Sequence, residues 1–223
     1  MSKGLFIQAI SKFMLGLVLT GLLLFWPAGT LSFWNAWLFI SILFIPMFFV
    51  GAVLMVKNPQ LLQRRLKSRE TLADQDAVVK LSGLMFLCGF ALAGLNHRFR
   101  WSVLPRAVSM GAAALFLLAY LMYAEVLREN AYLSRIIEVQ KGQRVIDTGL
   151  YAVVRHPMYS ATVLLFLSMP LVLGSLPSFA LFLVYPFLIT RRIRSEEELL
   201  SRELEGYRAY QCKVKYRLIP FIW

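Results

Sequence analysis

Long stretches without a charged side chain constrain the fold of this chain more than any other feature. Residues 33–56 and 107–127 each reach the roughly 20 residues that a helix needs to cross a bilayer, and Glu125 is the one charged residue within them. Residues 13–26 and 81–95 form shorter runs, so they cross only if flanking residues join the helix. These four runs predict four membrane-spanning helices.

A fifth uncharged run, residues 158–190, is too interrupted to form one helix. Pro170, Gly174, Ser175 and Pro177 lie within it, and residues of these types mark turns. We therefore expect a tight helical hairpin with two arms that are short, tilted or only partly spanning. All the runs together predict an all-α integral membrane protein with about five to six transmembrane helical segments. Charged residues make up 16% of the chain, against about 25% in soluble proteins.

Lys and Arg are distributed unevenly between the loops. All of them except Arg98, Arg100 and Arg106 lie before the first run, between the second and third, or after the fourth. Because such residues collect on the cytoplasmic side, both termini are predicted to be cytoplasmic in a multi-pass protein. The net charge of +12 then reflects topology and attraction to membrane lipid. We expect no nucleic-acid partner, since the basic residues flank spans instead of forming one face.

Two regions follow from this organisation. Residues 1–127 form an N-terminal transmembrane scaffold of about four spans, and residues 128–223 hold the hairpin, a polar segment and a cytoplasmic tail. The connection 57–80 is interpreted as a surface helix or as a solvated connector, with Leu61, Leu62, Leu66 and Leu72 as its apolar positions.

The tail is expected to start as a helix, residues 191–205, that continues out of the membrane. Gly206 is a candidate C-cap for it, and the aromatic residues beyond could fold back as a lid.

A polar cluster stands at the mouth of the hairpin, with the sequence Arg155-His156-Pro157-Met158-Tyr159. Pro157 suits the first turn of a helix, where its missing N–H would have no partner. The cluster is either one side of a site for a charged small molecule or an anchor to the headgroups. Two cysteines without CxxC spacing and two histidines predict no metal site.

A second pair, Arg192 and Glu196, lies just beyond the hairpin. Residues four apart share a helix face, so the two side chains can bind opposite charges of one ligand or form a solvated ion pair.

These residues resemble one known family. The run 142–159, followed by Arg192, Glu196, Glu197, Gly206-Tyr207, Tyr210 and the stretch 216–220, is similar to the isoprenylcysteine carboxyl methyltransferase family, whose superfamily includes phospholipid N-methyltransferases. Two residues depart from the family pattern. Leu150 stands where the family usually has Pro or another turn residue, and Ala161 stands where many members have Gly.

The resemblance implies a membrane enzyme that uses S-adenosyl-L-methionine to methylate a lipophilic acceptor, such as the carboxylate of an isoprenylcysteine-like lipid. By position, the cofactor-binding residues would be Gln143, Arg144, Val145, Ile146, Tyr151, His156, Pro157, Met158, Tyr159, Glu196 and Glu197. Arg192 would be the catalytic residue that contacts the acceptor.

Two alternatives share some of these features. One is an NADPH-dependent membrane sterol or enone reductase, whose relatives have a similar RHPxY pattern and tail; that pattern commonly has Asn where this chain has Met158. The other is a membrane scaffold without enzymatic activity, in which the polar clusters are interface anchors.

Overall fold

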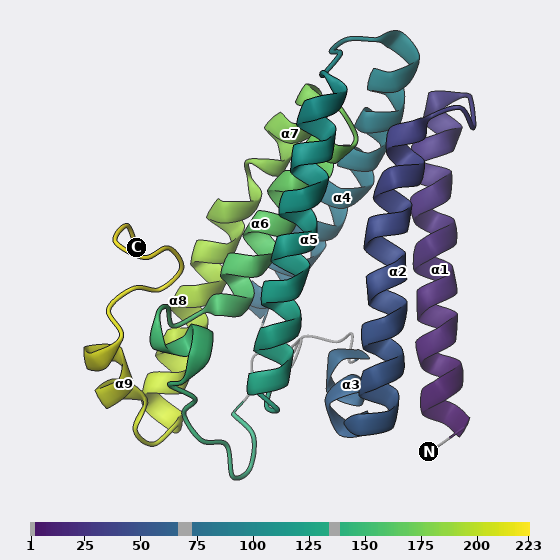
Figure 1. Cartoon of the computed structure of the whole chain (residues 1–223). Helices are drawn as coiled ribbons and strands as arrows, with labels where there is room; N and C mark the ends of the chain where they lie inside the picture. Colours follow the sequence, from purple (N-terminus) through teal and green to yellow (C-terminus); the bar gives the residue numbers. More distant parts are fainter. Residues whose placement is uncertain (1–2, 67–72, 134–138) are drawn as a thin grey trace.

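In the computed structural model the residues that the structure describes, 3–66, 73–133 and 139–223, form helices and loops with no strand. The helices are α1 (Lys3–Ala28), α2 (Trp34–Lys57), α3 (Pro59–Leu66), α4 (Ala73–Phe99), α5 (Arg106–Glu129), the 3₁₀ turn η1 (Gly149–Ala152), α6 (Pro157–Val172), α7 (Leu176–Phe182), α8 (Tyr185–Glu203) and α9 (Tyr207–Lys213). Figure 1 shows a bundle of long helices, with α8, α9 and the C-terminal tail at its lower left.

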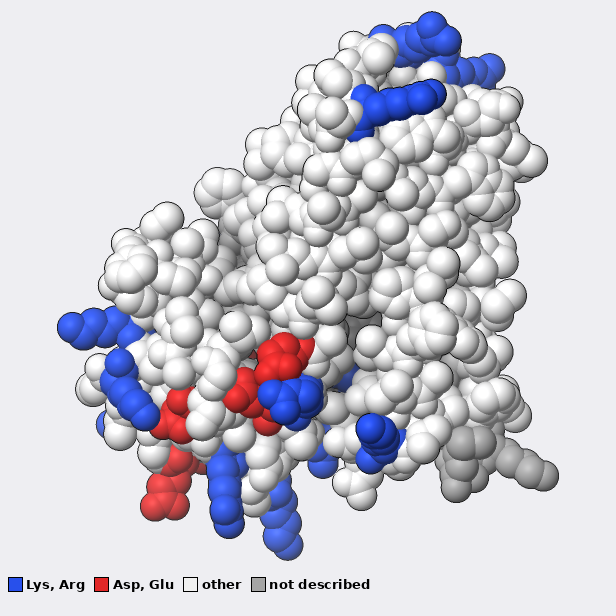
Figure 2. All heavy atoms as spheres, viewed as in Figure 1, with Lys and Arg blue, Asp and Glu red and all other residues white. Residues whose placement is uncertain are grey.

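Five stretches are long and apolar enough to cross a membrane: Gly4–Ala28, Trp34–Lys57, Ala77–Phe99, Arg106–Glu129 and Leu176–Glu203. The two shorter runs are extended by their flanks as expected, because α1 and α4 have 26 and 27 residues. Figure 2 shows a broad uncharged band between two charged ends of the molecule. Large side chains such as Ile7, Phe49 and Leu121 are exposed on these helices. Such a surface suits lipid, so the fold is that of a multi-pass integral membrane protein.

The predicted hairpin is present, and its second arm is longer than expected. α6 ends at Val172, and Gly174, with φ +70°, lies in the turn. Ser175 then caps α7, because its Oγ accepts a hydrogen bond from Ser178 N at 3.2 Å. α8 begins two residues after α7 and continues well beyond residue 190. α8 ends at Glu203, close to the end of the helix that the sequence predicts over residues 191–205.

The bundle core is built from large aromatic side chains. Phe39 of α2, Phe116 of α5 and Phe182 of α7 are fully buried. α4 approaches α7 closely at Gly89, where a methyl group would overlap the Phe182 ring. Small residues of this kind allow helices to pack closely in a membrane. The close contact fixes the position of α7 and therefore the start of α8.

The connections bear on two of the sequence predictions, of which the first agrees with the surface-helix interpretation. α3 is a surface helix with Leu61 and Leu62 buried, while Leu72 lies outside the described residues. Gly206 has the expected positive φ of +80°, but α8 already ends at Glu203. The C-cap prediction for Gly206 was wrong, because this residue instead precedes a short further helix, α9.

Candidate functional site

The Arg155–Tyr159 cluster is held in place by the C-terminal tail. α6 begins at Pro157, as predicted. The backbone N–H groups of Arg155 and His156 donate to the carbonyls of Tyr216 and Arg217 at 2.8 and 2.9 Å. The tail residues therefore pair with the start of α6. None of residues 214–223 lines the open cleft that lies in front of the Arg155–Tyr159 cluster. The end of the tail is thus a brace, whereas Tyr207 and Tyr210, the first aromatic residues beyond Gly206, line the cleft.

Behind this cluster, Glu197 of α8 forms a buried ion network. Its carboxylate accepts hydrogen bonds from Arg155 Nε at 2.6 Å and Arg217 Nε at 2.8 Å. His156 Nε2 lies 3.2 Å from the same carboxylate. The side chains of Glu197 and Arg155 are only 6% and 8% exposed. Both charges are therefore removed from water and depend on each other.

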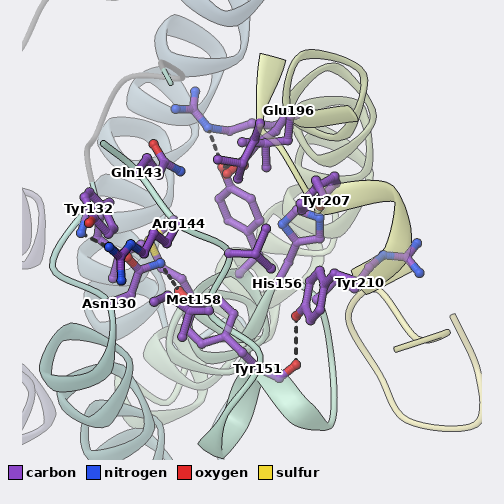
Figure 3. Close-up of a pocket in the computed structure, with 18 residues that line it drawn as sticks. Asn130, Tyr132, Gln143, Arg144, Tyr151, His156, Met158, Glu196, Tyr207 and Tyr210 are labelled. Atoms are coloured by element: carbon purple, nitrogen blue, oxygen red, sulfur yellow. Dashed lines mark hydrogen bonds between the residues drawn. The ribbon is translucent and has the colours of Figure 1, made fainter. Parts of the chain in front are cut away.

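An open cleft of about 840 Å³, counted with its mouth, lies in front of the cluster. The lining comes from the polar segment, the start of α6, and α8 and α9: Asn130, Tyr132, Leu133, Gln143, Arg144, Val145, Ile146, Tyr151, Arg155, His156, Met158, Tyr159, Arg192, Glu196, Leu200, Leu204, Tyr207 and Tyr210. Figure 3 shows Tyr132, Gln143 and Arg144 facing His156 and Tyr207 across this space.

Ten of the twelve residues selected from the sequence line this cleft: Gln143, Arg144, Val145, Ile146, Tyr151, His156, Met158, Tyr159, Arg192 and Glu196. Pro157 and Glu197 do not. Pro157 is fully buried in the first turn of α6, and Glu197 is engaged by the network behind. Both hold lining residues in position, and their assignment to cofactor binding stays a prediction.

Three polar side chains meet at the inner end of the cleft. Tyr159 Oη donates to Glu196 Oε2 at 2.6 Å and accepts from Arg192 Nε at 3.1 Å. Arg192 is itself 8% exposed. The tyrosine thus holds a carboxylate and a guanidinium at fixed positions beside each other. Such a site can bind a ligand that has both a positive and a negative group.

Tyrosines form the wall opposite the polar segment. Tyr210 Oη donates to Tyr151 O at 2.7 Å, and Asn130 Nδ2 donates to Tyr151 Oη at 2.9 Å. Tyr207 is 4% exposed, and its buried hydroxyl has no hydrogen-bond partner among the described residues. Burial raises the pKa of Tyr151, Tyr207 and Tyr210, so all three hydroxyls are protonated at neutral pH. An unpartnered buried hydroxyl is costly, and a ligand in the cleft would give that of Tyr207 an acceptor.

The segment 139–148 supplies the facing wall and is fastened at both ends. Tyr132 Oη donates to Gly142 O at 2.9 Å, and Lys213 Nζ contacts Asp147 Oδ2 at 2.7 Å. Gly149 follows with φ +50° and lies against the Glu129 carboxylate, so a larger residue there would meet both strain and a clash. Residues 143–146 are thus presented to the cleft without regular secondary structure.

A second groove adjoins the cleft on the membrane side. It has a volume of about 850 Å³ and runs between α4, α6 and α8. Met158, Tyr159 and Arg192 line both spaces. The other lining residues are Arg65, Val78, Val79, Ser82, Gly83, Phe86, Thr162, Phe166, Tyr185 and Ile189, of which none is acidic. A polar cleft and a largely apolar groove therefore meet at the same three side chains.

Sequence reasoning missed several lining residues. Leu200 and Leu204 had a usable signal, because they follow Glu196 at intervals of four on α8. Arg155 belonged to the cluster that was singled out, but no cleft position was assigned to it. Tyr207 and Tyr210 belonged to the pattern that carries the family resemblance, but no cleft position was assigned to them. Asn130, Tyr132 and Leu133 had no comparable signal, since loops bring them to the cleft.

Comparison with known proteins agrees with the resemblance. Residues 111–202 match the isoprenylcysteine carboxyl methyltransferase (ICMT) family model. The matched residues extend from within α5 to the last turn of α8. The Delta(14)-sterol reductase TM7SF2 of Mus musculus is 28% identical over 90 residues, which cover 39% of this chain and 22% of the reductase. The chain thus spans about a fifth of the length of that relative.

Proposed function

Because residues 111–202 match the isoprenylcysteine carboxyl methyltransferase family, we propose that the protein is an S-adenosyl-L-methionine-dependent methyltransferase acting on a lipophilic acceptor within the membrane. One observation carries the proposal. The polar cleft and the apolar groove share Met158, Tyr159 and Arg192, so a water-soluble cofactor and a lipid can reach one point from two sides.

The cleft residues fit S-adenosyl-L-methionine, which has an ammonium, a carboxylate and a sulfonium. Glu196 suits the ammonium, and Arg144 suits the carboxylate. The aromatic wall suits the sulfonium and the adenine ring, and the Tyr207 hydroxyl would gain an acceptor. Val145 and Ile146 would offer backbone groups to the adenine edge. When bound, the cofactor supplies an electrophilic methyl group.

The residues of the chain would mainly position the reactants and exclude water, and would contribute less through acid–base chemistry. Arg192 orients an anionic acceptor without titrating, and Tyr159 holds Arg192 relative to Glu196. The side chains of Arg192 and Tyr159 are both buried, so few water molecules compete with the acceptor. Methyl transfer is an in-line displacement, so its rate depends strongly on how the two reactants are positioned. The sulfonium and an anionic acceptor lose their opposite charges in this step, and the exclusion of water favours that loss. A carboxylate acceptor needs no general base.

The groove favours an acceptor with a long apolar part. Val78, Phe86 and Ile189 are typical of its lining, and Gly83 is exposed with open space above it. Arg65 of α3 also lines it, and hydrogen bonding to the Tyr123 hydroxyl fixes its guanidinium. Two guanidiniums, those of Arg65 and Arg192, suit an anionic head group. With both termini cytoplasmic, as the Lys and Arg distribution predicts, the cleft would open to the cytoplasm.

A reductase is the second candidate, because a sterol reductase shares a segment with this chain. An NADPH-dependent reductase would bind a cofactor with several phosphate charges. Glu196 stands at the inner end of the cleft, and the Arg155 guanidinium is already bound by Glu197. This charge arrangement favours a cationic cofactor over a polyanion. A phospholipid N-methyltransferase would use the same cofactor on an amine acceptor.

The test uses purified full-length protein, a membrane lipid extract and S-adenosyl-L-methionine labelled on the methyl group. We expect label in a lipid product, and Gly83→Leu should lower transfer by about tenfold or more by filling the groove. The matched control is Gly111→Leu on α5, another exposed glycine with open space. Arg192→Ala should impair transfer more than cofactor binding.

Two results would reject the proposal. NADPH-dependent reduction of a lipid without methyl transfer would favour the reductase. Equal transfer by Gly83→Leu and Gly111→Leu would exclude the groove as the acceptor site.

A further inference from the structure

A separate open cavity of about 940 Å³, counted with its mouth, lies at the other end of the bundle. It is lined by Phe33, Trp34, Asn35, Asn96, His97, Arg100, Ser102, Val103, Leu104, Arg106, Leu173 and Gly174. α5 starts at this cavity and ends beside Asn130 of the cleft, so its 24 residues separate the two sites by about 36 Å. The cavity is therefore independent of the proposed methyl-transfer site.

The floor of this cavity is a rigid set of buried amides. Asn35 Nδ2 donates to Ser109 Oγ at 3.0 Å and to Val172 O at 2.7 Å. Asn96 Nδ2 donates to the carbonyls of Ser102 and Gly174 at 3.1 and 3.2 Å. These bonds connect α2, the α4–α5 connection, α5 and the hairpin turn. The cavity is thus formed before any ligand arrives, which lowers the cost of binding.

The rim carries cationic side chains, and none of the described residues that line the cavity is acidic. Arg100 and Arg106 line the cavity, and the Arg106 guanidinium stacks over the Trp34 ring at 5.7 Å. The His97 ring stacks on Phe33 at 4.1 Å. Arg106 is also the first residue of α5, where the positive end of the helix dipole adds to its charge.

The described residues around these guanidiniums supply no counter-charge. None of the residues that line the cavity is acidic, and residues 1–69, 77–124 and 148–195 contain no Asp or Glu at all. Figure 2 shows Lys and Arg but no Asp or Glu at this upper end of the visible face. An anion from outside the chain would balance the charge.

The geometry points to a phosphate-binding site in this cavity, formed by Arg100 and Arg106 above the amide floor. A guanidinium matches phosphate with two parallel N–H groups, and stacking on Trp34 holds one of them in place. The cavity lies at an end of the membrane-spanning helices, where phospholipid head groups are found. The phosphate can come from an anionic lipid of the adjacent leaflet or from free phosphate.

The experiment measures the melting temperature of the purified full-length protein in a neutral detergent. Short-chain phosphatidylglycerol, short-chain phosphatidylcholine and inorganic phosphate are titrated separately. The test variant is Arg100→Gln/Arg106→Gln. The matched control is Arg98→Gln, which changes an exposed arginine on the same end that does not line the cavity.

We expect phosphatidylglycerol to stabilise the native protein and Arg98→Gln alike. In the double variant its apparent affinity should fall by about tenfold or more. Stabilisation by inorganic phosphate that is lost in the double variant would instead assign the site to the free anion. Equal stabilisation of all variants, or of none, would overturn the proposal. Similar melting temperatures without ligand would show that the variants fold.

Discussion

Two neighbouring glutamates on α8 have opposite surroundings. Glu197 faces a closed network in which Arg155, Arg217 and His156 all contact one carboxylate. Glu196 lines the cleft, where it accepts a hydrogen bond from Tyr159. The first carboxylate is saturated by the protein, and the second still has capacity for a ligand. The layer behind the cleft therefore stabilises the fold, whereas the lining is available to a ligand.

The largest effect is expected for Glu197→Gln, which keeps the shape but removes the charge. Buried Arg155 would lose its counter-ion, and breaking such a pair costs about 3–5 kcal/mol. Arg217 is 34% exposed and can turn to water, so Arg155 should dominate the loss. Thermal unfolding in detergent measures it. Native stability combined with weak cofactor binding would instead return Glu197 to the lining that the sequence predicted.

Smaller effects are expected at Tyr210 and Tyr207 of the cleft wall, on stability for the first and on cofactor affinity for the second. Tyr210→Phe leaves the buried Tyr151 carbonyl without its donor, so stability should fall by about 1–3 kcal/mol. Tyr207→Phe removes a buried hydroxyl without a partner among the described residues, so unliganded stability should hold or rise. Its cofactor affinity should fall by about 0.5–1.5 kcal/mol.

Melting curves with and without S-adenosylhomocysteine separate the two tyrosine variants. If Tyr207→Phe destabilises the unliganded protein as much as Tyr210→Phe does, the Tyr207 hydroxyl already has a partner and is not reserved for a ligand.

The smallest effect is expected at the exposed Asp147–Lys213 pair, which fastens the segment 139–148 to α9. The hydrogen bond from Lys213 lowers the pKa of Asp147 below its usual value. The pair therefore stabilises the fold above the unfolded pKa of about 3.9, and this contribution disappears as the pH falls through the lowered folded value.

Asp147→Asn should accordingly melt slightly below the native protein at neutral pH, with a gap that closes in acid and in high salt. A gap that widens on acidification would contradict the assignment of this pair.

Much of the fold could be predicted because lipid imposes a simple rule on composition. Uncharged runs gave the spans, and Pro170, Gly174 and Ser175 gave the hairpin turn. The extended second arm was harder, since α8 changes from apolar to charged without a break after residue 190. α9 was missed because it has only seven residues, and so short a segment shows little helical periodicity in its sequence.

The site was predictable where its residues are close in sequence. The runs 143–146 and 155–159 and the pair Arg192 and Glu196 supplied most of the lining. Adjacent glutamates point about 100° apart on a helix, but only the position of the tail shows which one faces the cations. Tyr207 and Asn130 reach the cleft through tertiary contacts, which sequence spacing does not encode.

Cofactor binding measured by calorimetry tests the central claim most directly. Purified native protein should bind S-adenosyl-L-methionine or S-adenosylhomocysteine in the micromolar range and should bind NADPH far more weakly. Glu196→Gln should weaken binding by about ten- to a hundredfold while the melting temperature of the unliganded protein changes little. Binding of NADPH in place of both ligands, or equal binding by the native protein and Glu196→Gln, would contradict the account.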